Sequence, residues 1–113
     1  DKEGWPIKDK DVFVDLSADN LNPDGSVVDA SNCLWNAQGG ASRVAKYRPE
    51  GKFLESIKFP VTQVTCPAFG GEDLKTLFVT SASIDLPDSI NNDGVTFSID
   101  LKVLGQKEHQ VIL

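Results

Sequence analysis

Short runs of alternating apolar and polar residues dominate the chain, and turn residues separate them. The runs Arg43–Tyr47 and Thr96–Asp100 alternate as half-buried strands do. The segment 22–25, Asn-Pro-Asp-Gly, is a strong turn signal, because proline presets one φ angle and glycine accepts a positive one. Between residues 26 and 59, no stretch has apolar residues at the spacing of a helix. The pattern therefore predicts an all-β chain.

The predicted strands repeat in order along the two halves of the chain. They lie at 26–29, 33–37, 43–47, 53–59, 65–69, 75–80 and 96–100, with a last strand in the tail that follows Gly105. Four short strands joined by tight turns are the plan of a propeller blade, and one blade takes about 40–50 residues.

The length therefore predicts about two blades, at 22–60 and 61–113, preceded by a leader strand at 11–16. Two blades cannot close a ring, so this pattern indicates part of a β-propeller or a chain that assembles with copies of itself. A self-contained β-sandwich of seven or eight strands is the alternative that the same pattern allows.

Charge and cysteine content exclude several classes of function. With 17 acidic and 11 basic residues, the net charge is -6, which disfavours binding to nucleic acids and to anionic membrane surfaces. No run approaches the roughly 18 apolar residues that a membrane span needs. Cys33 and Cys66 have neither a disulfide-scaffold pattern nor metal-site spacing, which favours a reducing, cytoplasmic setting.

The absence of methionine and the start at Asp1 predict a piece of a longer protein.

Four blocks of sequence point to one family. NPDGSVVD at 22–29, LWNAQ at 34–38 and RVAKYRPEG at 43–51 resemble the gluconolactonase/regucalcin (SMP-30) family. TCPAFGGEDLKTLFVTSA at 65–82 is similar to the signature near the C-terminus of that family. The resemblance implies a C-terminal fragment of a six-bladed β-propeller. It also implies that the full-length protein hydrolyses sugar lactones with one divalent metal in a central pocket.

The implied chemistry depends on Asp24. Taken alone, Pro-Asp-Gly is a turn whose aspartate is usually solvated or caps its own backbone. The resemblance makes Asp24 a metal ligand, and a carboxylate suits Ca²⁺ first, with Mg²⁺, Mn²⁺ or Zn²⁺ as alternatives. The same carboxylate can instead serve as the general base for a water. Calcium takes about 6–8 oxygens, and the other family ligands lie outside this chain. We therefore expect this chain alone to bind metal weakly and to be inactive.

Asn36, Gln38 and Cys66 are candidate substrate contacts. Asn36 and Gln38 stand near a strand end, where they either recognise hydroxyl groups of a sugar lactone or are simply polar strand residues. Cys66 either lines the pocket or is a small buried residue. A catalytic thiolate is not expected, because the sole histidine, His109, lies near the end of the chain. Family members often carry a bulky residue, usually tryptophan, between the positions of Gln38 and Gly39, so the departure here leaves the substrate open.

Two other functions remain open on the same scaffold. One is a non-enzymatic calcium-binding or regulatory protein, and the other is a structural module that binds partners through its propeller edges. Uncovered sheet faces also predict self-association, in which three two-blade copies would add up to a six-bladed ring.

Overall fold

The structure is a computed structural model that describes residues 2–3, 5–86 and 92–112. Its strands are β1 (Asn22–Val28), β2 (Leu34–Gly39), β3 (Arg43–Tyr47), β4 (Phe53–Lys58), β5 (Gln63–Gly70), β6 (Thr76–Ala82) and β7 (Thr96–Asp100). The one helical element of this described part is η1 (Ser17–Asp19), a single 3₁₀ turn. The prediction of an all-β chain is confirmed. No described helix has the length and apolar character to cross a bilayer.

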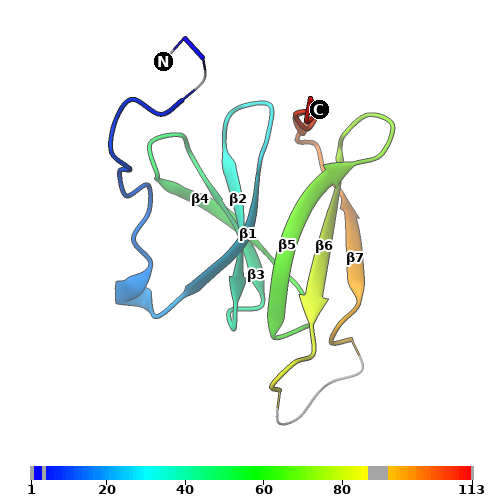
Figure 1. Cartoon of the computed structure of the whole chain (residues 1–113). Coiled ribbons are helices and arrows are strands. Elements are labelled where there is room, and N and C mark those ends of the chain that lie inside the picture. Colours follow the sequence, from blue (N-terminus) through cyan, green and yellow to red (C-terminus); the bar gives the residue numbers. More distant parts are fainter. Residues whose placement is uncertain (1, 4, 87–91, 113) are drawn as a thin grey trace.

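The strands form two antiparallel meanders that stand beside each other (Figure 1). The first sheet has the order β1-β2-β3-β4, and the second has the order β5-β6-β7. The two sheets meet where β5 lies against β1 and β2. The sheets fall within the two predicted repeats, 22–60 and 61–113, whose boundaries stay a prediction.

Alternation along the strands builds the core between the two sheets. Trp35 and Ala37 point from β2 toward the second sheet. There they pack in one cluster with Val64, Leu77 and Val79, and all five side chains are fully or almost fully buried. The rings of Trp35 and Phe69 meet edge to face, with centroids 5.8 Å apart. Burying each large apolar side chain contributes about 1.5–3 kcal/mol, so this interface is what holds the two sheets together.

A buried carboxylate organises the connection between β1 and β2. Asp29 accepts hydrogen bonds from the backbone N–H of Ser31 at 2.9 Å and of Cys33 at 3.0 Å, and from Trp35 Nε1 at 3.0 Å. Lys46 Nζ lies 3.3 Å from Asp29 Oδ2. Burial by itself would raise the pKa of Asp29, but these hydrogen bonds and Lys46 together lower it below its usual value.

As far as it is described, through residue 112, the chain after β7 adds no fourth strand to the second sheet, so the predicted strand after Gly105 is wrong. Instead, the Ala30 N–H donates to the Leu104 carbonyl at 2.8 Å, and Gln106 Nε2 donates to the Asp29 carbonyl at 2.7 Å. Gly105 forms a bridge with Asp29 and donates its N–H to the Leu74 carbonyl. The segment 101–106 thus ties the two sheets together at one end.

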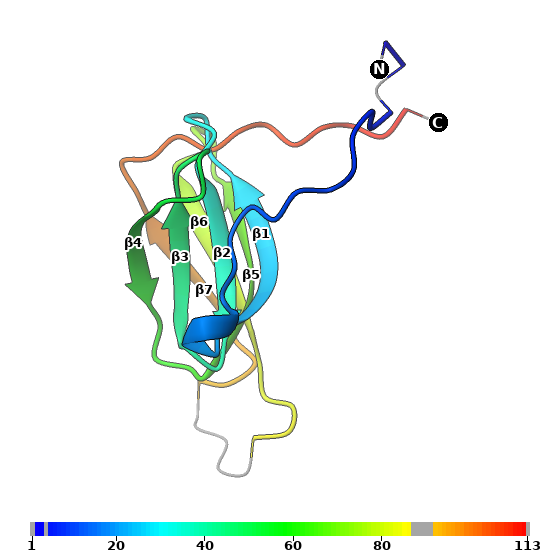
Figure 2. The same ribbon diagram turned by 90° about the vertical axis from the view of Figure 1, so that its left-hand side faces the viewer.

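The predicted leader strand at 11–16 is also wrong. This segment runs across the outer face of the first sheet and leads into η1 (Figure 2). Within the described residues it has no neighbouring strand with which to form a ladder, and an isolated extended segment does not become a strand without one. Asp15 ends it by accepting hydrogen bonds from the N–H and hydroxyl of Ser17, and the hydroxyl bond above all lowers the pKa of Asp15.

Candidate functional site

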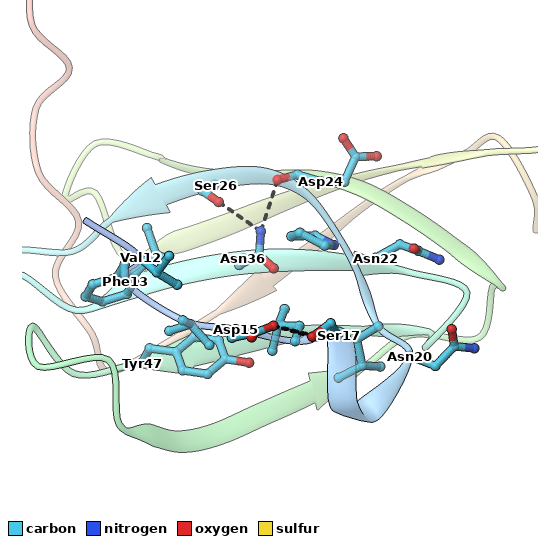
Figure 3. Close-up of a pocket in the computed structure, with 15 residues that line it drawn as sticks. Val12, Phe13, Asp15, Ser17, Asn20, Asn22, Asp24, Ser26, Asn36 and Tyr47 are labelled. Atoms are coloured by element: carbon cyan, nitrogen blue, oxygen red, sulfur yellow. Dashed lines mark hydrogen bonds between the residues drawn. The ribbon is translucent and has the colours of Figure 1, made fainter. Parts of the chain in front are cut away.

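Asp24 lies on β1 at a break in the ladder with β2. The register shifts between Pro23 and Ser26, so Asp24 belongs to a bulge. Its side chain is exposed, and Figure 3 shows the carboxylate on the side of β1 that faces away from Asn36. Across the part of the chain that the structure describes, no hydrogen-bond or ion-pair partner is assigned to this carboxylate. It is therefore available to solvent or to a ligand.

The backbone of Asp24 is held from both sides. On one side, Asn36 Nδ2 donates to the Asp24 carbonyl at 3.0 Å and to Ser26 Oγ at 2.9 Å (Figure 3). On the other side, Gly25 packs directly on β5. A methyl group at Gly25 would lie 2.6 Å from Cys66 Sγ, so only glycine fits here. The bulge that presents Asp24 is thus fixed although its side chain is free.

Asn36 and Gln38 share the outer face of the first sheet, away from the second sheet. Gln38 is fully buried: its Nε2 donates to Tyr47 Oη at 2.7 Å, and its Oε1 accepts from Arg43 Nε at 2.6 Å. Asn36 is 5% exposed, and its Oδ1 is buried without a described partner. The structure therefore brings Asn36 to the backbone of Asp24, but it brings neither amide to the carboxylate.

Cys66 is exposed on β5, whereas Cys33 is buried. The interpretation of Cys66 as a small buried residue is wrong, because β5 has its own register shift between Val64 and Cys66, which turns the side chain outward. Its thiol lies against Gly25 and 3.6 Å from the Pro67 carbonyl oxygen. Cys66 is thus a neighbour of the Asp24 bulge.

Two hollows border Asp24. A cavity of about 830 Å³ lies on the outer face of the first sheet, between β1, β2 and the segment 12–21 (Figure 3). A smaller cleft of about 410 Å³ lies between β1 and β5, the facing edge strands of the two sheets. Polar side chains of Asn22, Asp24, Gln63 and Thr65 line part of this cleft, and the rest is lined by Val64, Ala82, Ile84 and the backbone of Gly39 and Gly40. The sequence reasoning missed Asn22, Gln63 and Thr65.

A signal for these missed residues exists in the sequence. Asn22 is the first residue of the Asn-Pro-Asp-Gly segment at the start of β1, and Gln63 is the first residue of Gln-Val-Thr-Cys at the start of β5. Both are polar residues at strand starts, next to the bulges that interrupt β1 and β5. Recognising β1 and β5 as neighbours would have placed the two amides at one cleft.

A divalent metal does not fit this chain on its own. The described residues contain no group of three or more histidine, cysteine, aspartate or glutamate side chains that could hold an ion. Asp24 can supply one carboxylate, and Asn22 adds an amide at the same cleft. Since hard divalent cations need about six or more oxygen ligands, most of such a set would have to come from outside this chain.

Comparison with known proteins identifies the family. Residues 1–83 match the SMP-30/gluconolactonase/LRE-like region. The chain is 38% identical to the L-arabinolactonase of Azospirillum brasilense, over 77% of this chain and 28% of the relative. It is 30% identical to the pentonolactonase of Haloferax volcanii, over 96% of this chain and 40% of the relative. The chain therefore belongs to the SMP-30/gluconolactonase/LRE-like family, and it spans less than half of these relatives' length.

A solved structure confirms the architecture. The calcium-binding regucalcin of Agrobacterium tumefaciens superposes with a TM-score of 0.90 at 36% identity, covering 97% of this chain and 39% of regucalcin. The two sheets are thus about two blades of the family's propeller, as predicted, and the sandwich alternative is not supported.

Proposed function

We propose that this chain is part of a sugar lactonase in which Asp24 is the reactive carboxylate of these two blades. The observation that carries the proposal is the contrast at the bulge: the Asp24 backbone is fixed by Asn36 and Gly25, while its carboxylate has no described partner. A carboxylate carried on such a fixed backbone starts from a defined position without being neutralised. Relatives named as lactonases support a cyclic sugar ester as the substrate class.

The role of each residue follows from its contacts. The Asp24 carboxylate either accepts a proton from the attacking water or contributes one oxygen ligand to a divalent cation, first calcium and otherwise magnesium, manganese or zinc. A bound cation would supply Lewis-acid polarisation of the lactone carbonyl. Asn36 positions Asp24 by donating a hydrogen bond from its side-chain amide to the backbone carbonyl of Asp24. Cys66, exposed beside Gly25, is the remaining candidate for direct substrate contact.

Gln38 does not contact the Asp24 carboxylate. Its amide is saturated by Tyr47 and Arg43 on the outer face of the first sheet. We infer a supporting role, in which Gln38 holds β2 and β3 in register. Because Cys33 and Cys66 are both free thiols, we also place the protein in a reducing compartment, the cytoplasm.

Lactone hydrolysis by the full-length protein that contains this chain tests the proposal. Asp24→Asn keeps the size of the side chain and removes its charge, so kcat should fall by about 10²-fold or more, the typical contribution of a positioned acid–base group. A chelator should abolish turnover, and added calcium should restore it. The matched control is Glu50→Gln, an exposed acid in the β3–β4 turn, which should retain full activity. Full activity of Asp24→Asn would contradict the proposal.

A second candidate function is binding or regulation without catalysis. It is favoured by one observation, the close superposition on a protein described as a calcium-binding regucalcin. Saturable calcium binding by the full-length protein, lost in Asp24→Asn and without turnover of any sugar lactone, would support this function over the lactonase.

We further propose that this 113-residue chain associates with copies of itself. The outer face of the second sheet carries exposed Cys66, Ala68 and Phe78, with Phe78 40% exposed. Exposed small residues beside one aromatic ring suit contact with another sheet, and a second copy supplies one. Size-exclusion chromatography with light scattering should show a multimer, and a clean monomer at micromolar concentration would contradict this.

A further inference from the structure

The cleft between β1 and β5 has features of a recognition site in its own right. It encloses about 410 Å³ beside Asp24, and both blades contribute to it. Asn22 comes from β1 and Gln63 from β5, so the cleft exists only because the two blades meet here.

The polar groups at this cleft have unused hydrogen-bonding capacity. For the side-chain amides of Asn22 and Gln63, no hydrogen-bond partner is assigned within the described residues, and the same is true of the Asp24 carboxylate. Thr65 differs, because its hydroxyl lies 2.7 Å from the Thr80 hydroxyl, which anchors that wall of the cleft. Two amides, each with donors and an acceptor, and one carboxylate acceptor match the mixed donor and acceptor character of sugar hydroxyls.

Gly39 keeps the cleft open. Along β2, Trp35, Ala37 and Gly39 share the face that looks toward the second sheet. A Cβ atom at Gly39 would meet only the Asn22 carbonyl oxygen, at 3.9 Å, and its φ is not left-handed, unlike that of Gly40 at 80°. The backbone therefore tolerates a side chain at position 39, and such a side chain would extend toward the cleft.

We propose that this cleft is a subsite for the hydroxyl groups of a polyhydroxylated ring, with the amides of Asn22 and Gln63 as binding groups and Gly39 as the position that sets its size. The inference rests on the proposed function in one respect: the ring would be the sugar lactone placed beside Asp24. It goes further by assigning specificity to three residues of this chain.

The test uses the 113-residue chain and a ring that cannot be hydrolysed. The probe is 1,5-anhydro-D-glucitol, and its matched control is tetrahydropyran, which has the same ring without hydroxyl groups. In ¹H–¹⁵N spectra, the side-chain amide signals of Asn22 and Gln63 should shift saturably with the probe and stay unchanged with tetrahydropyran. The amide of Gln38, saturated on the opposite face of the first sheet, should not respond. Equal shifts with both rings, or no shift at Asn22 and Gln63, would overturn the inference.

Two variants sharpen the result. Gln63→Leu removes one or two neutral hydrogen bonds and should weaken the Kd for the probe about two- to tenfold. Gln110→Leu, in the exposed tail, is the matched control and should leave the Kd unchanged. Gly39→Leu should fill the cleft and abolish binding while its backbone spectrum stays folded. Wild-type affinity in folded Gly39→Leu would overturn the assignment of this position.

The two proposals can fail separately. Lactone turnover by the full-length protein together with an unresponsive cleft would overturn the subsite and leave the lactonase intact. A responsive cleft in a protein without lactone turnover would support the polyol subsite and overturn the lactonase.

Discussion

The two ends of β1 carry the same residue type in opposite environments. Asp29, just past one end, is fully buried and receives three hydrogen bonds and a lysine. Asp24, at the other end, is exposed and free of described partners, although its backbone is held by Asn36. A carboxylate whose oxygens are saturated stabilises the fold, whereas an unsaturated carboxylate on a fixed backbone can act on a ligand. The difference between structural and chemical roles thus lies in what each side chain touches.

Replacing Asp29 should have the largest effect on stability. Asp29→Ala leaves Lys46 without its buried partner and Trp35 Nε1 without an acceptor, which should cost about 3–5 kcal/mol in the free energy of unfolding. Urea denaturation measures this loss, and Asp24→Ala, on β1, is the matched control, with a change within about 0.5 kcal/mol. Similar losses in both variants would remove the contrast between the two ends of β1.

Acid should weaken the contribution of Asp29 to stability. Because the folded state lowers the pKa of Asp29, its contribution is fully present above the unfolded value of about 3.9 and is lost as the pH falls through the folded pKa. The stability gap between wild type and Asp29→Asn should therefore narrow as the pH falls from 7 to 3. Urea midpoints across this range measure the gap. A constant gap would show that the Asp29 carboxylate does not contribute through its charge.

Replacing Gly105, which forms a bridge with Asp29, should lower the free energy of unfolding by a smaller amount. It passes over Phe69 so closely that a Cβ atom would collide with that side chain. Gly105→Ala must displace either the ring or the segment that ties the sheets together, which should cost about 1–3 kcal/mol. Gly40→Ala is a control in open space, where only the positive φ opposes the change. Thermal unfolding that ranks Gly40→Ala as the more damaging change would contradict the role of this contact.

The alternation of apolar and polar residues correctly predicted strands whose conformation depends on that alternation. The runs Arg43–Tyr47 and Thr96–Asp100 became β3 and β7 with the predicted bounds, because alternation reflects a sheet with one buried face. The leader at 11–16 and the tail after Gly105 failed for a different reason. Their conformation depends on whether a neighbouring strand is present and on which backbone groups lie nearby, and neither can be read from the residues themselves.

The candidate site divides in the same way. Asp24 could be located from the family resemblance, because its role depends on a short motif. The turn predicted at 22–25 is wrong, since this segment is the bulged start of β1. The side-chain partners of Asp29, Trp35 and Lys46, come from β2 and β3, and the partners of Gln38 come from β3, so these contacts have no sequence signal. Gln63 was missed because its meaning depends on β5 lying beside β1.

One preparation tests the central claim most directly: Asp24→Asn in the full-length protein, measured for both unfolding free energy and kcat/KM on a sugar lactone. A free carboxylate on a fixed bulge predicts unchanged stability, within about 0.5 kcal/mol, together with a fall in turnover of about a hundredfold or more. Unchanged turnover, or a loss of turnover that merely follows a loss of stability, would contradict the chemical role of Asp24.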